Sequence, residues 1–322
     1  MLFIVEKLDM GIKKEVAINT QEMSEQEMWL ALPNVEKEEK ADLLISLARS
    51  ASYRGSHGQS LELAQAALRV YEEMGASAPT VEVAGCHWGM GFALKALQKT
   101  DDAMEEIDKA IALYRECNYP FLDDVLRTRA TWCAEMHDWD GTLIAHLEAI
   151  QLNEIEGNTE WEARSYLNAG FAYIHMNNFQ EALIAFQTAR AKFAEVKMVP
   201  DVARADRWIA DAYSELGEAK LAYEHARRSL NVAELMQERL PIMFSEFEVG
   251  KALLVGGELL DESETHLNRA YNQAISVEAN EMDWEFIIKV QRQRIKLLRL
   301  QNRVSEAEEL ESKIATVTEV IE

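Results

Sequence analysis

Residues 166–189, YLNAGFAYIHMNNFQEALIAFQTA, have the pattern of two short helices joined by a polar turn. Gly170 and Tyr173 lie three residues apart and therefore share a face of the first helix. Asn177 and Asn178 supply the polar turn. The residues that share one face of the second helix are Ala182, Phe186 and Ala189. Small residues let two helices approach closely, so the stretch predicts a helical hairpin.

The same pattern recurs with a period of about 40 residues. Small residues equivalent to Gly170, here called anchors, are Ala48, Gly91, Ala130, Ala210 and Gly250, so that successive anchors are 43, 39, 40, 40 and 40 residues apart. A second-helix triplet begins 12 or 13 residues after each anchor. The other triplets are Ser60, Ala64, Ala67; Ala103, Ile107, Ala110; Thr142, His146, Ala149; Ala222, Ala226, Ser229; and Ser263, Leu267, Ala270.

A seventh unit is expected at the C-terminal end, where the spacing is looser. Its apolar residues are Ile295, Leu298, Ala307, Leu310 and Ile314. Proline supports the same division, because it breaks helix interiors and marks the joints between units. The prolines at these joints are Pro79, Pro120, Pro200 and Pro241.

These residues resemble the tetratricopeptide repeat, in which large, small and aromatic residues on one helix meet Ala, aromatic and Ala on the next. The best match is made by Tyr166, Gly170, Tyr173, Ala182, Phe186 and Ala189. The resemblance covers roughly residues 36–320. The period exceeds the family's usual length of about 34 residues, and is similar to that of the longer-repeat subclass in bacterial and phage peptide-receptor regulators and in sensor arrays of signalling ATPases. It implies an all-α, right-handed superhelical solenoid of about seven helical hairpins.

The domain organisation follows from this array. We expect residues 1–35 to form an N-terminal capping segment and residues 36–322 to form the repeats, with the last unit, about 284–322, acting as a cap. The opening MLFIVEKLD is compatible with a strand or an apolar helix. Ser24 and Glu27 predict a capping box at the start of a helix that ends before Pro33.

Composition narrows the classes of partner. The 33 Lys and Arg against 56 Asp and Glu give a net charge of −23, which argues against direct binding of nucleic acid. No apolar run is long enough to span a membrane, the start lacks a leader pattern, and three cysteines form no disulfide framework. We therefore expect a cytoplasmic protein with a protein or peptide partner, and a homo-oligomer is compatible with the sequence.

Catalytic chemistry is not indicated. The motifs GxSxG, HExxH and GxGxxG are missing from the sequence, so we expect no catalytic residues, no cofactor and no metal. Cys133 and His137 lie four residues apart, a spacing that suits two ligands of one metal as well as simple burial in the core.

The most informative constellation lies on the first helices, which line the concave surface of a solenoid of helical hairpins. The positions three and six residues before an anchor, and one, four and five after it, face a bound peptide. The candidate residues of this peptide-binding groove are Tyr53, Trp88, Phe92, Arg127, Arg164, Phe171, His175, Arg204 and Arg207, and the resemblance adds Asn168. The groove is therefore predicted to be aromatic in the N-terminal half and basic at the centre.

The resemblance adds a carboxylate clamp to this groove. Arg127, Asn168 and Arg204 match three of the positions with which short-repeat relatives hold a peptide's terminal carboxylate, whereas Thr131 and Trp208 depart from that pattern. Arginine suits a carboxylate because it donates two parallel hydrogen bonds. The alternative is that the arginines form ion pairs with neighbouring acids; these acids are Asp124, Glu162 and Asp206.

The expected first helix of the seventh unit carries a stripe of basic residues. Its residues, at steps of three and four, are Lys289, Arg292, Lys296, Arg299 and Arg303. They either pair with acids downstream, Glu306, Glu308, Glu309 and Glu311, or bind an acidic partner or another copy of the chain.

Two functions follow as hypotheses. The first is a non-enzymatic regulatory or scaffolding module that binds an extended or anionic segment of a peptide or protein. The second is a sensor whose superhelical pitch changes when a small peptide or metabolite binds.

Overall fold

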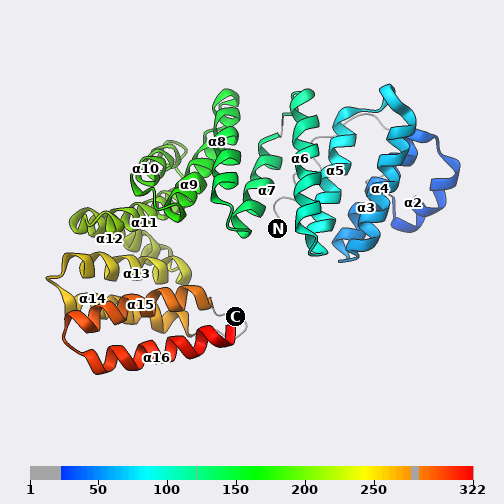
Figure 1. Cartoon of the computed structure of the whole chain (residues 1–322). Helices are drawn as coiled ribbons and strands as arrows, with labels where there is room; N and C mark the ends of the chain where they lie inside the picture. Colours follow the sequence, from blue (N-terminus) through cyan, green and yellow to red (C-terminus); the bar gives the residue numbers. More distant parts are fainter. Residues whose placement is uncertain (1–22, 121, 277–282, 322) are drawn as a thin grey trace. The chain divides into compact units, whose positions relative to one another are not determined.

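The computed structural model describes residues 23–120, 122–276 and 283–321, with the side chains of 316–321 left out. The described residues form helices and no strand (Figure 1). The stretch MLFIVEKLD lies outside the described residues. Ser24 accepts a hydrogen bond from the Glu27 N–H and caps α2 (Glu25–Ala31), which confirms the predicted capping box. A short 3₁₀ helix, η1 (Leu32–Asn34), follows and contains Pro33.

Seven helical hairpins follow within the described residues. Their first helices are α3 (Lys37–Tyr53), α5 (Thr80–Ala96), α7 (Leu122–Glu135), α9 (Thr159–His175), α11 (Val199–Glu215), α13 (Arg239–Gly256) and α15 (Trp284–Leu300). Their second helices are α4 (His57–Met74), α6 (Thr100–Glu116), α8 (Trp139–Glu156), α10 (Phe179–Glu195), α12 (Ala219–Met236), α14 (Leu260–Ala274) and α16 (Val304–Ile321). A 3₁₀ turn, η2 (Gly75–Ser77), follows α4.

The anchors and triplets predicted from the sequence form the buried contacts inside these hairpins. All six anchors and all eighteen triplet residues are buried. Gly170 faces the buried Phe186 ring, and Gly250 faces Leu267 in the same way. In the last hairpin, Ile295, Leu298 and Ala307 form a buried cluster against Leu310 and Ile314. The predicted register and the seventh unit are therefore confirmed.

Every hairpin turns on a residue in the left-handed backbone conformation. These residues are Gly55, Gln98, His137, Asn177, Gly217, Gly257 and Asn302, with φ between 58° and 79°. Each lies seven positions after an anchor, if Ile295 is taken as the anchor of the last hairpin. This conformation ends a helix and lets the chain reverse. The turn explains His137, whose exposed side chain belongs to the turn between α7 and α8.

The prolines lie at the joints between hairpins, as the sequence predicts. Pro79 caps α5 and Pro120 precedes α7. Pro200 and Pro241 lie inside the first turns of α11 and α13, where a missing N–H costs no helical hydrogen bond. Two of the four prolines thus lie in the first turn of a helix and not in the segment that connects two hairpins.

The chain divides into two compact units, residues 1–149 and 150–322, with the division inside α8. The first unit has a core around Leu43, Leu47 and Tyr71. The second unit has successive cores between α9 and α11, between α11 and α13, and between α13 and α15. None of the described helices meets the length and hydropathy that a membrane crossing requires.

Candidate functional site

The first helices of the second unit touch one another through large side chains, and we call the surface that these side chains form the inner face. Contacts to aromatic rings join each of these first helices, from α9 to α15, to the next one. Phe171 meets Trp208 with ring centroids 5.1 Å apart, Arg207 lies 5.0 Å from the Phe244 ring, and Lys289 lies 5.3 Å from the Phe247 ring. The inner face is thus a band of alternating rings and cations.

Arg207 is held firmly on this face. Its guanidinium carbon lies 4.4 Å from the Trp208 ring centroid and 5.0 Å from that of Phe244. Burial lowers the pKa of Arg207, yet an arginine stays charged at neutral pH. No hydrogen bond or ion pair joins it to another residue that the structure describes. Arg207 is therefore an oriented cation, with the buried Glu248 and Asp211 carboxyl groups as its electrostatic neighbours.

A pocket of about 280 Å³ opens beside Arg207, between α11, α12 and α13. Arg204 and Arg207 line one side of it. Its apolar wall consists of Val232, Ala233, Met236, Leu240, Pro241 and Phe244. Ser229 and Ser245 also line it, but their hydroxyls hydrogen-bond to each other at 2.8 Å. Two acids, Asp201 and Glu238, line it as well, and Asp201 pairs with Arg204. An anionic group beside a bound apolar side chain would therefore have to meet Arg207.

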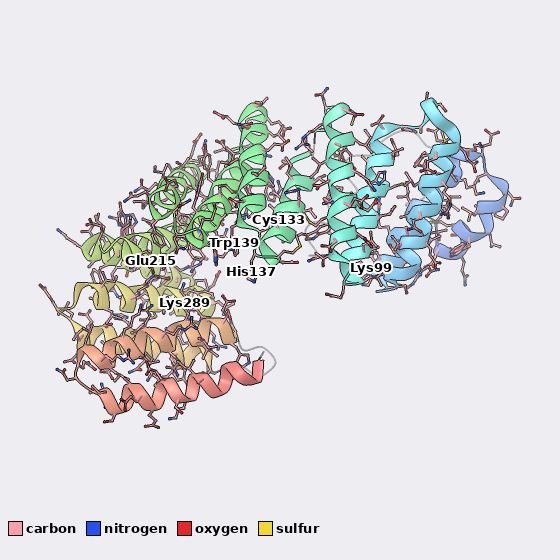
Figure 2. All side chains as sticks on the ribbon, viewed as in Figure 1. Lys99, Cys133, His137, Trp139, Glu215 and Lys289 are labelled. Carbon is pink, nitrogen blue, oxygen red and sulfur yellow. The ribbon has the colours of Figure 1, made fainter. Side chains whose placement is uncertain are left out.

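A buried charge network lies next to Arg207. Lys251 on α13 donates to Asp211 and Glu215, both on α11. Figure 2 labels Glu215 at the end of α11 and Lys289 on α15. Glu248 is 1% exposed, and its Oε2 atom has no hydrogen-bond partner among the described residues.

The charges in this network shift one another's proton affinity. Burial, reinforced by the Asp211 carboxylate, raises the pKa of Glu248 to about 7. Burial also disfavours the Asp211 carboxylate, but Lys251 and Lys289 outweigh it and hold the pKa of Asp211 below its usual value. The pKa of Lys251 is raised, because Asp211 and Glu248 outweigh its own burial. Near neutral pH the network therefore includes one carboxyl group, Glu248, that exchanges its proton.

The structure places most of the predicted groove arginines in ion pairs. Arg164 pairs with Glu160 at 3.0 Å and approaches Asp201 at 3.8 Å. Arg204 also pairs with Asp201. The alternative of ion pairing therefore holds for both, although with other acids than those expected.

The remaining groove candidates of the second unit lie on α9. Asn168 and His175 are exposed, and the Phe171 and His175 rings pack edge to face at 4.5 Å. Phe171 also meets Trp208, so it belongs to the inner face. Together with Arg207, these residues lie on the two helices that the offset rule predicts.

The groove candidates of the first unit are arranged differently. Arg127 forms ion pairs with Asp123 and Asp124 on its own helix. Trp88 is only 4% exposed, because its ring packs on Tyr114 of α6, with centroids 6.3 Å apart. The expectation that Trp88 lines an open surface is therefore wrong.

Two aromatic candidates of the first unit are accessible. Phe92 is half-buried and meets the Trp132 ring at 5.4 Å, and Tyr53 is 65% exposed. They remain predicted contact residues.

The list of groove candidates omitted residues of α13, although the same spacing in the sequence indicates them. The offsets that point to Arg204 and Arg207 point equally, from the anchor Gly250, to Phe244 and Phe247, and the offset of one residue after the anchor points to Lys251. Asp211 occupies the matching position one residue after Ala210.

The metal site considered for Cys133 and His137 has no support among the described residues. No three His, Cys, Asp or Glu side chains converge there to hold a metal ion. Cys133 is fully buried, and burial raises its pKa to about 11. His146 is also buried, which lowers its pKa to about 4, and His225 lies 2.6 Å from the Asp206 carboxylate. These side chains belong to the packing of the hairpins.

Comparisons with known proteins agree with the fold. No family model matches the chain, and no curated protein matches its sequence. Aspartyl phosphate phosphatase F from Bacillus subtilis is similar, with a TM-score of 0.63 and 14% identity over 98% of this chain and 79% of that chain. A Rap protein complexed with Competence and Sporulation Factor gives a TM-score of 0.52 and 12% identity over 91% of this chain and 79% of that chain.

A third similar structure is a signal transduction ATPase from Pyrococcus horikoshii that carries a tetratricopeptide repeat sensor. Its TM-score is 0.59 at 14% identity, over 91% of this chain and 46% of that chain. With its seven hairpins and confirmed register, this chain has a tetratricopeptide-like helical repeat fold.

Proposed function

We propose that this chain is a non-enzymatic regulatory or scaffolding module that binds an extended segment of a peptide or protein on the inner face of its second unit. The observation that carries the proposal is Arg207, a cation fixed between two rings beside an apolar pocket. The bound segment places an acidic group on Arg207, from a side chain or a chain end, and an apolar side chain in the pocket.

The physical case rests on preorganisation. A free arginine side chain loses rotamer freedom when it binds, but the rings of Trp208 and Phe244 already restrict Arg207. Its planar donors match a carboxylate in two parallel hydrogen bonds. Asn168, exposed on the neighbouring first helix, can bond to the backbone of an extended segment through its amide.

Similar proteins support a binding role. One Rap protein was solved complexed with Competence and Sporulation Factor, and the Pyrococcus repeats are described as a sensor. The Bacillus protein is named a phosphatase. A non-enzymatic role is favoured here because the two pocket hydroxyls, Ser229 and Ser245, bond to each other and not to a general base.

A sensor is the alternative, and one ion-pair network favours it. Lys251 ties α13 to α11 through Asp211 and Glu215. An anionic ligand at Arg207 would attract Lys251 and weaken these ties, so that the spacing of the first helices would change. Small-angle scattering of the full chain with and without a saturating peptide distinguishes a sensor, whose dimensions change, from a passive scaffold.

The proposal is tested with an array of random peptides, screened with the wild-type chain and with Arg207→Ala. Arg228→Ala, which removes an exposed cation from α12, is the matched control. We expect selected peptides to combine a carboxylate with a large apolar residue, and Arg207→Ala to weaken them by at least about tenfold. Equal binding by Arg207→Ala and the wild type would refute the site, and a screen that selects no peptides would refute the function.

A further inference from the structure

The basic stripe of α15 is only partly neutralised by the chain itself. Arg299 pairs with Glu311 at 2.6 Å, and Arg303 pairs with Glu306 at 2.7 Å and with Glu264 at 2.8 Å. Lys289, Arg292 and Lys296 form no ion pair with any residue that the structure describes, and all three are exposed. The expected pairing with downstream acids therefore holds for the C-terminal end of the stripe and fails for the rest.

These three cations belong to the inner face. Lys289 lies 5.3 Å from the Phe247 ring, and its charge acts on the buried Asp211 and Glu248 carboxyl groups. Relative to the anchor Ile295, Arg292 occupies the position that Arg207 occupies relative to Ala210. Lys296 likewise occupies the position of Lys251 relative to Gly250. The offset rule that located Arg207 thus places the stripe on the same surface.

Three like charges so close together repel one another. Steps of three and four residues along a helix separate them by about 4.5 and 6 Å along the axis, which is well within the range of electrostatic interaction at physiological salt. Like charges at these spacings weaken a helix by a few tenths of a kcal/mol per pair. In a chain of net charge −23, this exposed cluster stands out against its surroundings. An anionic partner would relieve the repulsion.

We propose that Lys289, Arg292 and Lys296 form a docking surface for an acidic segment of a partner protein or peptide. In this segment, several Asp or Glu residues lie close to one another in sequence. The proposal rests on the proposed function of the inner face and names the chemistry of the segment. Arg292 can hold one carboxylate with two hydrogen bonds, while the two lysines act as point charges. The net negative charge of the chain disfavours the longer polyanion of a nucleic acid.

The test is a fluorescence-anisotropy titration of the full chain with three probes: a labelled Glu-rich peptide, a Gln-rich peptide of equal length, and a single-stranded oligonucleotide of equal charge. The test variant combines Lys289→Gln, Arg292→Gln and Lys296→Gln. The control variant removes three cations from second helices by Arg69→Gln, Lys220→Gln and Arg228→Gln, so that both variants have the same net charge. Melting curves are recorded for both, because Lys289 also favours the charged form of the buried Asp211, and binding is compared at a temperature at which both variants are folded.

We expect the Glu-rich peptide to bind the wild type and the control, and to bind the test variant at least about tenfold more weakly, with a loss of affinity in added salt. Exchanging the charges, by Lys289→Glu, Arg292→Glu and Lys296→Glu, should transfer binding to a Lys-rich peptide. The proposal is overturned if the Glu-rich peptide binds nothing, if both triple variants bind it equally, or if the oligonucleotide binds more tightly than the peptide.

The two proposals fail in different ways. If Arg207→Ala abolishes binding of the array peptides while the α15 variant binds the Glu-rich peptide like the wild type, the α15 surface is refuted and the Arg207 site stands. If the Glu-rich peptide depends on α15 while Arg207→Ala leaves all peptides unaffected, the Arg207 site is refuted and the α15 surface stands.

Discussion

Gly170 lies directly against the buried ring of Phe186, so that a Cβ atom on Gly170 would come within 2.5 Å of Phe186 Cε1. The ring is fully buried, so any shift of it would disturb the side chains packed around it. The contact fixes the distance at which α9 and α10 cross, and it repeats between Gly250 and Leu267.

The first prediction concerns this contact. Gly170→Ala should destabilise the protein by about 1 to 3 kcal/mol, because the methyl group forces the helices apart or the ring off its rotamer. Gly89 is a matched control, since it is also helical but nothing lies within 4 Å of its Cβ position. Gly89→Ala should stabilise by about 0.5 to 1 kcal/mol through helix propensity. Thermal melting measures both, and a Gly170→Ala protein as stable as the wild type would show that the register is wrong.

The second prediction concerns the hairpin turns. Gln98 holds a φ of 62° and Gly217 holds a φ of 79° at equivalent turn positions. Because side chains with a Cβ disfavour this conformation, Gln98→Gly should stabilise, and Gly217→Gln should destabilise, by on the order of 1 kcal/mol each. Urea unfolding gives both values. Changes of the same sign in the two variants would contradict the argument.

The third prediction concerns the pH dependence of stability. Burial and Asp211 raise the pKa of Glu248 from 4.5 to about 7, while Arg207, Lys251 and Lys289 oppose that rise. The folded state thus binds this proton more tightly than the unfolded state. The resulting stability is fully present below pH 4.5 and is lost as the pH rises through about 7.

Glu248→Gln cannot ionise and should escape this loss. Relative to the wild type, the variant should gain on the order of 1 to 3 kcal/mol in free energy of unfolding between about pH 5 and about pH 8. Urea unfolding at both pH values provides the measurement, with exposed Glu234→Gln as the control. A difference between Glu248→Gln and the wild type that does not change with pH would refute the assignment.

The fourth prediction concerns the independence of the hairpins. Ending the chain at Ser276 removes α15 and α16, whose Phe286, Ile287 and Val290 pack against Met243 and Phe247. Because helical repeats contact mainly their neighbours, α13 and α14 should lose stability while α9 and α10 keep theirs. Amide hydrogen exchange should report this gradient. Uniform loss of protection across residues 159–274 would contradict a repeat array.

The sequence predicted the repeat because close helix crossings admit only small residues, and those residues recur at one spacing. It also predicted the turn at Asn177, since Asn tolerates the left-handed conformation, but Gln98 and His137 gave no such signal. In these positions the fold overrides the local preference.

The candidate site was predicted only in part, and the cause differs from that for the turns. Arg204 and Arg207 share the predicted face, yet one pairs with Asp201 while the other stacks between rings. Several acids and rings lie within reach of each arginine, and the choice among them depends on side-chain packing between neighbouring helices. Offsets from an anchor can locate a surface but cannot assign its ion pairs.

The common turn geometry has a consequence for how such a protein changes size. Removing residues 178–217 would join Asn177 to Glu218, so that a left-handed turn residue would again be followed by the residue that precedes a second helix. A hairpin can thus be lost or duplicated without any new kind of joint. Each such event shortens or lengthens the inner face by one first helix, about 8 to 10 Å. The length of the segment that a protein of this kind binds would therefore change by one hairpin at a time. Two or three side chains on each first helix would set the chemistry that the added part of the inner face recognises.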